Sequence, residues 1–303
     1  MNVLIAGGTG AIGLPLARAL FAAGHQVTAL SRSTARHADL RGTGITAVAV
    51  DALDRVALRR VVERAHPTHV VHQLTALPEG GPRRNSEIEA TNRLRIEGTR
   101  NLLDAAIHAG AERFIVGSFA VLGAGGHKGT ASTRTSAVDA VQSMETQVLE
   151  ATRRGAIEGL ILRYGLFYGL EAGSTRAMLA MVKARRLPVP REDHGVLPMI
   201  HVQDAVQATI RALDHGEAGA VYNVVDNQPV SMTRLIDAMA HEVGAPRPFR
   251  IPVWLMRLLA PLPARMSRIQ LPLSNAETRA ALGWSPMYPT IDDGVHALSR
   301  AGA

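Results

Sequence analysis

The chain has 303 residues, which is enough for one large domain or two modest ones with a well-formed buried core. Its 33 basic and 26 acidic residues give a net charge of +7, but the basic residues are scattered and only 4% of the residues are aromatic, so the pattern does not favour nucleic-acid binding. The absence of cysteine excludes disulfides, thiolate metal clusters and cysteine nucleophiles.

The sequence starts with a short apolar run that leads directly into glycines, without a charged leader, and it contains no stretch of 18 apolar residues. We therefore expect a cytoplasmic protein with neither a membrane partner nor a nucleic-acid partner. The oligomeric state is open, and a homodimer is one candidate assembly.

Short β-branched runs alternate with helical patterns over the first two-thirds of the chain, which predicts parallel strands joined by crossover helices. The predicted strands cover residues 3–6, 27–30, 46–50, 69–74, 114–118, 160–164 and 221–225. The predicted helices cover residues 11–23, 53–65, 92–109 and 138–153. The expected fold class is therefore α/β, a doubly wound parallel Rossmann sheet that binds ligands at the carboxyl ends of its strands.

After Gly169 the regular alternation stops and prolines become frequent, which predicts a smaller C-terminal substrate lobe. We expect residues 1–168 and about 199–228 to form the dinucleotide-binding domain, and residues 169–198 and 229–303 to form the lobe. A lobe that covers the strand ends would create a cleft for a small-molecule substrate.

A glycine-rich turn follows the first predicted strand and opens the first helix. Gly7 permits a tight turn, Gly10 lets a pyrophosphate approach the backbone, and Gly13 lets the helix pack closely on the strand. The N–H groups around Ala11 and Ile12 are the expected phosphate donors. Such a turn alone is a weak signal, but the flanking strand and helix indicate a dinucleotide site.

The end of the second predicted strand carries Ser31, Arg32 and Ser33, where an acidic residue would bind the adenosine ribose. Arg32 can pair with a 2′-phosphate and the two serines can donate to it, which favours NADP as the cofactor. The alternative is that Arg32 is a solvated loop residue.

Asp51, at the end of the third predicted strand, has two possible roles. Its carboxylate either accepts a hydrogen bond from the adenine amino group or caps the helix expected to begin near Leu53. We place Asp51 among the predicted cofactor contacts, together with Ala52 and Leu74.

Six segments, in chain order, resemble the extended short-chain dehydrogenase/reductase family, the nucleotide-sugar epimerase/dehydratase superfamily. They are residues 7–13 (GGTGAIG), 70–72 (VVH), 98–103 (GTRNLL), 162–169 (LRYGLFYG), 200–204 (IHVQD) and 282–286 (LGWSP). Because these segments span nearly the whole chain, the resemblance implies the fold and the nicotinamide cofactor of that family.

In this family a Ser or Thr, a Tyr and a Lys carry catalysis, and the last two are spaced as Tyr-x-x-x-Lys on the helix after the fifth strand. The chain contains no such pair, because neither of its two lysines, Lys128 and Lys183, follows a tyrosine by four residues. Ala140 and Met144 stand at the places of the Tyr and the Lys. The chain therefore resembles an atypical branch that keeps the cofactor fold without the triad.

The departure from the triad leaves the proton donor open, because a hydrocarbon side chain cannot donate a proton. Phe119 aligns with the catalytic Ser or Thr, although a shift of one residue restores Ser118. Tyr164 and Tyr168 lie on the turn that in this family passes the nicotinamide. We name Ser118, Tyr164 and Tyr168 as candidate catalytic residues, while a buried Tyr hydroxyl can equally serve as a structural hydrogen-bonding group.

The 12 histidines do not form a metal motif. His69 and His72 fall on one predicted strand and point to opposite faces, and no HExxH-type helix is present, so we predict no metal. The glycine-rich segment 123–129 carries His127 and Lys128, which either are solvated or close over a substrate.

These residues are compatible with three alternative functions. The leading one is an NADP-dependent oxidoreductase, without the triad, that acts on a small apolar or aromatic molecule. Phe119, Ala140 and Met144 replace polar groups, and Leu197 stands where nucleotide-sugar relatives carry an arginine, with Arg191 the nearest basic residue upstream. The alternatives are a non-redox isomerase or cyclase that retains NADP, and an NADP(H)-sensing binding protein.

Overall fold

The computed structural model describes residues 1–300 except 79, 83 and 121–135, so His127 and Lys128 lie outside the described residues. Seven parallel strands form the main sheet in the order β10-β6-β5-β4-β1-β2-β3. They are β1 (Asn2–Ala6), β2 (Gln26–Ser31), β3 (Thr46–Ala49), β4 (His69–His72), β5 (Arg113–Phe119), β6 (Glu158–Tyr164) and β10 (Val221–Val224). The strand order reverses between β1 and β4, which confirms the predicted doubly wound α/β fold.

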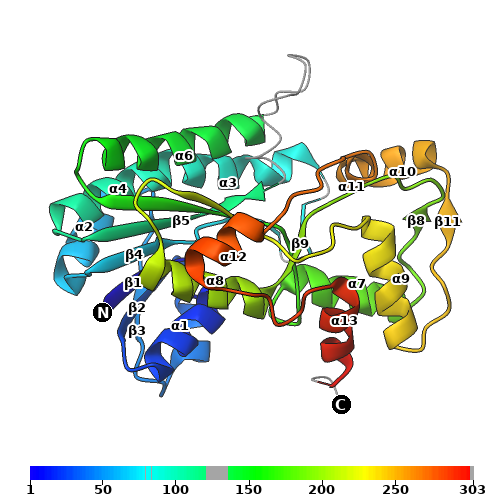
Figure 1. Ribbon diagram of the computed structural model, residues 1–303, viewed down its shortest axis with the longest axis horizontal. Coiled ribbons are helices and arrows are strands. Elements are labelled where there is room, and N and C mark those ends of the chain that lie inside the picture. Colours follow the sequence, from blue (N-terminus) through cyan, green and yellow to red (C-terminus); the bar gives the residue numbers. More distant parts are fainter. Residues whose placement is uncertain (79, 83, 121–135, 301–303) are drawn as a thin grey trace.

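Helices cover both faces of this sheet (Figure 1). One face carries α1 (Gly13–Ala22) and α8 (Val202–His215), and the other carries α2 (Arg55–Ala65), α4 (Thr99–His108) and α6 (Ser136–Arg153). Val3 and Ile5 pack in the apolar cluster of the first face, and Leu4 and Ala6 in that of the second. Because both faces are buried, the strands are continuously apolar rather than alternating.

The crossover from β4 to β5 contains a π-helical turn. The 3₁₀ turn η2 (Asn85–Ile88) leads into α3 (Glu89–Arg93), the π-helical segment η3 (Leu94–Gly98) and then α4. The sequence predicts a single helix over residues 92–109 here, without the π-helical turn. A π-helical turn inside a helix recurs at functional sites.

The chain after Tyr164 builds two short parallel strand pairs and the remaining helices. The pairs are β7 (Leu166–Tyr168) with β9 (Met199–His201), and β8 (Val189–Pro190) with β11 (Arg250–Ile251). The helices are α7 (Gly173–Lys183), α9 (Met232–Glu242), α10 (Val253–Leu259), α11 (Pro261–Met266), α12 (Ala276–Leu282) and α13 (Ile291–Arg300). The chain returns to the main sheet at α12, which packs against α8 and β10. The division into two domains stays a prediction.

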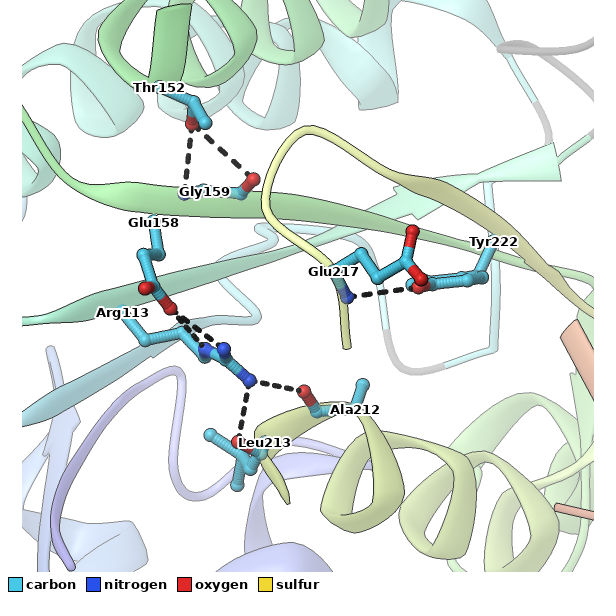
Figure 2. A network of polar contacts seen from close by, with 8 residues as sticks. All are labelled: Arg113, Thr152, Glu158, Gly159, Ala212, Leu213, Glu217 and Tyr222. Atoms are coloured by element: carbon cyan, nitrogen blue, oxygen red, sulfur yellow. Dashed lines mark hydrogen bonds and ion pairs between the residues drawn. The ribbon is translucent and has the colours of Figure 1, made fainter. Parts of the chain in front are cut away.

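A polar network holds the amino end of the sheet, where β5 and β6 begin (Figure 2). Arg113 donates to Oε2 of Glu158, 2.7 Å from Nη2. It also donates through Nη1 to the carbonyl oxygens of Ala212 and Leu213, in the last turn of α8. A cation is favourable at the carboxyl end of a helix. The network therefore stabilises the sheet at the end opposite to the glycine-rich turn.

Candidate functional site

The glycine-rich turn joins β1 to α1 at the point where the strand order reverses. Gly7 has a φ of 89°, and a side chain there would collide with the backbone of Gln73 at the end of β4. A side chain at Gly13 would collide with the carbonyl oxygen of Gly7. The Gly10 N–H donates to that same oxygen at 2.9 Å, which closes the turn. The backbone is therefore free of side chains where a pyrophosphate would lie.

Ala11 and Ile12 lie between the glycine-rich turn and α1, which begins at Gly13. The side chain of Ile12, the N-cap residue, forms no capping hydrogen bond, and no acidic residue stands in the first turn of α1. The positive end of the helix dipole therefore faces the turn without a competing carboxylate. These residues fit the phosphates of a dinucleotide.

The serines at the end of β2 make hydrogen bonds within their own loop. Ser31 is buried; its Oγ donates to the carbonyl oxygen of Ser33 at 3.0 Å and lies 2.8 Å from Nε2 of His37. Ser33 caps the 3₁₀ helix η1 (Thr34–Leu40), and its Oγ accepts from the Ala35 N–H at 3.3 Å. Both serines thus stabilise the loop that contains Arg32 and Arg36.

Arg32 and Arg36 are both exposed in this loop. Arg36 stands four residues after Arg32 in the sequence, within η1, and was not among the predicted cofactor contacts. An exposed guanidinium group is suited to binding an anion such as a 2′-phosphate.

Asp51 does not cap the following helix. Its Oδ1 accepts from the Leu53 N–H at 2.9 Å, but α2 begins at Arg55 and its N-cap is Asp54, which accepts from Val56 and Ala57. The expectation of a helix starting near Leu53 was therefore wrong by two residues, because Asp54 satisfies the free N–H groups of the first turn. The Asp51 side chain is exposed and its role toward adenine stays a prediction.

Ala52 and Leu74 lie behind the exposed part of this region. Ala52 is buried, and its carbonyl oxygen accepts from Nδ2 of Asn101 at 3.0 Å. Leu74 follows β4, and its N–H donates to Nδ1 of His72 at 3.2 Å. A hydrogen bond from α4 thus fixes the position of Ala52, and a hydrogen bond to the last residue of β4 fixes that of Leu74.

Tyr164, at the carboxyl end of β6, is fully engaged in hydrogen bonds. Its hydroxyl accepts from Nε2 of Gln73 at 3.0 Å and donates to Oγ1 of Thr209 at 2.7 Å, because Thr209 itself donates to the Ala205 carbonyl oxygen. Burial raises the pKa of Tyr164 well above its ordinary value. The geometry supports an orienting role for this hydroxyl, and its catalytic role stays a prediction.

Tyr168 is fully buried in the apolar cluster of the C-terminal half. Its hydroxyl donates to the Thr290 carbonyl oxygen at 3.2 Å, and its ring stands edge-on to His201 at 5.2 Å between ring centroids. Burial raises the pKa of Tyr168 above its ordinary value. Tyr164 and Tyr168 thus lie in two separate clusters, although both follow from the same sequence segment.

Ser118 is part of a buried polar group that the sequence analysis missed. Its Oγ donates to Oε1 of Glu145 at 2.5 Å. The Arg163 guanidinium donates to the same carboxylate, from Nε to Oε1 at 2.9 Å and from Nη2 to Oε2 at 2.6 Å. Ser118 and Arg163 are paired residues of β5 and β6, and Glu145 reaches them from α6. Because the Ser118 proton is committed to Glu145, the serine hydroxyl can act toward a further group only as a hydrogen-bond acceptor.

The positions aligned with the family's Tyr and Lys are closed to solvent. Ala140 and Met144 are 0% and 1% exposed on α6, and Met144 packs in the apolar cluster with Phe114 and Val148. Phe119, the last residue of β5, is half-buried. An ammonium group at position 144 would be costly without a partner, whereas methionine fits there without one.

Leu197, which stands at the arginine position of nucleotide-sugar relatives, is fully buried beside Tyr168 and Met199. Arg191 is exposed. Across the described ranges no group of three or more His, Asp or Glu side chains could hold a metal, and no helix there is long and apolar enough to cross a membrane.

Comparison with known proteins places the chain among nicotinamide-dependent enzymes of one family. Residues 3–225 match the NAD dependent epimerase/dehydratase family. The chain is 36% identical to a 3-diazoavenalumate denitrifying reductase from a Streptomyces species, over 97% of this chain and 99% of that protein. Its fold is similar to the crystal structure of UDP-glucose 4-epimerase from Thermotoga maritima, with a TM-score of 0.82 and 19% identity over 99% of this chain and 98% of that chain.

Proposed function

This chain belongs to the NAD-dependent epimerase/dehydratase family, and on that premise we propose that it is a reductase that uses NADPH to reduce a small, largely apolar diazo compound. The observation that carries the proposal is the 36% identity, over nearly the full length of both chains, to a denitrifying reductase whose name specifies a diazo substrate. The coarser statement, that the chain is a nicotinamide-dependent enzyme, rests on the family itself.

The absence of a Tyr-x-x-x-Lys pair supports this substrate class. A bound nicotinamide cofactor supplies a hydride, and replacing a diazonium group by hydrogen takes one hydride, forms one C–H bond and releases N₂ without a net proton. Reduction of a ketone, by contrast, needs a proton at the carbonyl oxygen. Ala140 and Met144 cannot deliver that proton, so the chain suits the first reaction better than the second.

The residues divide between the cofactor and the substrate in this proposal. The glycine-rich turn holds the pyrophosphate, and Arg32 with Arg36 holds the 2′-phosphate that distinguishes NADP from NAD. Ser118 accepts a hydrogen bond from the substrate, while Tyr164 and Tyr168 position the turn after β6.

The test is incubation with NADPH and an arenediazonium carboxylic acid, followed by analysis of the organic product. Diazonium ions decompose in water to a phenol and N₂, so the product in which hydrogen replaces nitrogen identifies the enzymatic reaction. We expect this product in equal amount to the NADP⁺ formed, and little with NADH. A phenol alone, with the NADPH unchanged, contradicts the proposal.

A thermal-shift screen with NADPH present tests the substrate class separately. We expect stabilisation by aromatic carboxylic acids and none by UDP-glucose, because unpaired sugar hydroxyls cost roughly 1–3 kcal/mol each against apolar side chains. Stabilisation by the nucleotide sugar alone would overturn the proposed substrate class. Cofactor binding without turnover of any compound would favour the non-redox or sensing alternatives.

A further inference from the structure

Arg95 is a half-buried arginine in the π-helical segment η3, and it has one long hydrogen bond within the part of the chain that the structure describes. Within the described residues, its hydrogen bonding is limited to Nη1 and Oδ1 of Asn92, at 3.4 Å, and no described carboxylate pairs with it. A guanidinium carries five N–H donors, so most of those of Arg95 have no acceptor among the described residues. Burial away from water lowers the pKa of Arg95 to about 10.

The Arg95 side chain runs toward the ligand-binding edge of the sheet. Asn92 stands one turn earlier in the helix, so the contact shows that the side chain lies back along the helix toward its start. The crossover helix runs antiparallel to the strands, and its start lies at their carboxyl ends. The Ala76 N–H donates to Oγ1 of Thr91 at 2.9 Å, which ties the loop after β4 to this helix start.

His72 lies within electrostatic range of Arg95 and cannot act as its counter-charge. It is the last residue of β4, and the nearby Arg95 charge helps burial to lower the pKa of His72 to about 4. Its Nδ1 accepts from the Leu74 N–H, and its Nε2 therefore donates to Oγ1 of Thr99 at 2.9 Å. The ring is neutral and both nitrogens are engaged. Arg95 thus places near His72 a positive charge that no carboxylate among the described residues balances.

The acidic residues of the same helix are not available to Arg95. Glu97 accepts from Nε of Arg93 at 3.1 Å on the exposed side. Glu89 is exposed as well. A partly buried charge without a counter-ion raises the free energy of the folded protein, and a ligand of opposite charge lowers that free energy on binding.

We infer that Arg95 binds the carboxylate of the substrate, which makes the proposed substrate site selective for organic anions. This inference rests on the proposed function and names its substrate class more closely. The cofactor pyrophosphate already has donors in the glycine-rich turn and the start of α1, so a second anion is the better match for Arg95. Planar guanidinium and carboxylate groups form two parallel hydrogen bonds.

The test is a calorimetric comparison of 4-hydroxycinnamate and its methyl ester as probes of the NADP⁺-saturated protein. The variants are Arg95→Met, Arg95→Lys and, as a matched control on the adjoining helix α4, Arg100→Met, whose arginine is exposed. We expect the wild type and Arg100→Met to bind the carboxylate at least about tenfold more tightly than the ester. Arg95→Met should lose this preference, and Arg95→Lys should keep part of it.

Three results would overturn the inference. One is an equal affinity of the wild type for the acid and the ester. Another is a carboxylate preference that Arg95→Met retains. The third is a loss of NADP⁺ affinity in Arg95→Met with the preference unchanged, which would make a cofactor phosphate the partner of Arg95. Because binding requires no turnover, these results are independent of whether the diazo reaction occurs.

Discussion

Arg32, which directly follows β2, is one of the two arginines proposed to hold the 2′-phosphate of NADP. Its charge-assisted hydrogen bonds reach only the 2′-phosphate, so Arg32→Ala should weaken NADPH binding by roughly 1.5–3 kcal/mol and leave NADH binding unchanged. Calorimetry with both cofactors measures this difference. Arg36→Ala is a second test of the same site and should also weaken NADPH binding, since Arg36 is exposed on the same loop and is proposed to hold the same phosphate. An unchanged ratio of the two affinities in Arg32→Ala would refute the assignment.

Glu145 is the centre of the buried group formed with Ser118 and Arg163. Loss of its ion pair with Arg163 should destabilise the fold more than loss of its hydrogen bond with Ser118. Glu145→Gln leaves the Arg163 guanidinium without a counter-charge and should lower the free energy of unfolding by roughly 3–5 kcal/mol. Ser118→Ala removes one hydrogen bond to a charged group and should cost roughly 1.5–3 kcal/mol. Urea denaturation of both variants measures the difference. Equal losses would show that the ion pair adds nothing beyond the serine contact.

The junction of β1 and α1 depends on close packing of two backbones. Gly13→Ala places a methyl group against the Gly7 carbonyl oxygen, so it should cost roughly 1–3 kcal/mol of stability and weaken cofactor binding as the turn shifts. Ala22→Gly, at the exposed end of the same helix, should cost only about 1 kcal/mol through helix propensity. Thermal unfolding with and without NADPH distinguishes the two effects, since Ala22→Gly should keep the full stabilisation by the cofactor.

The sequence predicts elements well where the signal is local and poorly where it depends on a distant partner. The apolar runs and the Gly7 to Gly13 turn predict the strands and the dinucleotide site because each is written in consecutive residues. Glu145 looks like a solvated position of a helix, and only Arg163, on a strand 18 residues later, makes its burial favourable. The π-helical turn at η3 leaves the apolar pattern of its helix intact, so Arg95 gives no signal in the sequence.

Asp226 and His72 give the molecule a pH dependence of stability through opposite shifts. Burial raises the pKa of Asp226 to about 8. The contribution of the protonated Asp226 to the free energy of unfolding is therefore fully present below about pH 4 and is lost as the pH rises toward 8. Burial lowers the pKa of His72 to about 4, so its contribution is complete above pH 6.5 and is lost as the pH falls toward 4. The two trends oppose each other below pH 6.5, and Asp226 alone acts between pH 6.5 and 8.

The free energy of unfolding should therefore fall as the pH rises from 6.5 to 8, by up to about 1.4 kcal/mol per pH unit for this one group. Asp226→Asn removes the titration and should flatten the slope relative to the wild type. Urea denaturation across this pH range provides the measurement. If both proteins show the same slope, Asp226 is not the group responsible.

The edge strand β10 joins the sheet long after the other strands have been synthesised. Six strands are complete at Tyr164, but β10 begins only at Val221, after the excursion through β7, α7, β8 and β9. Until then β6 offers an unpaired row of backbone N–H and C=O groups flanked by apolar side chains, which is a template for pairing with another chain. We therefore expect a truncated chain that ends before Val221 to aggregate more readily than the full chain, because its β6 edge stays unpaired.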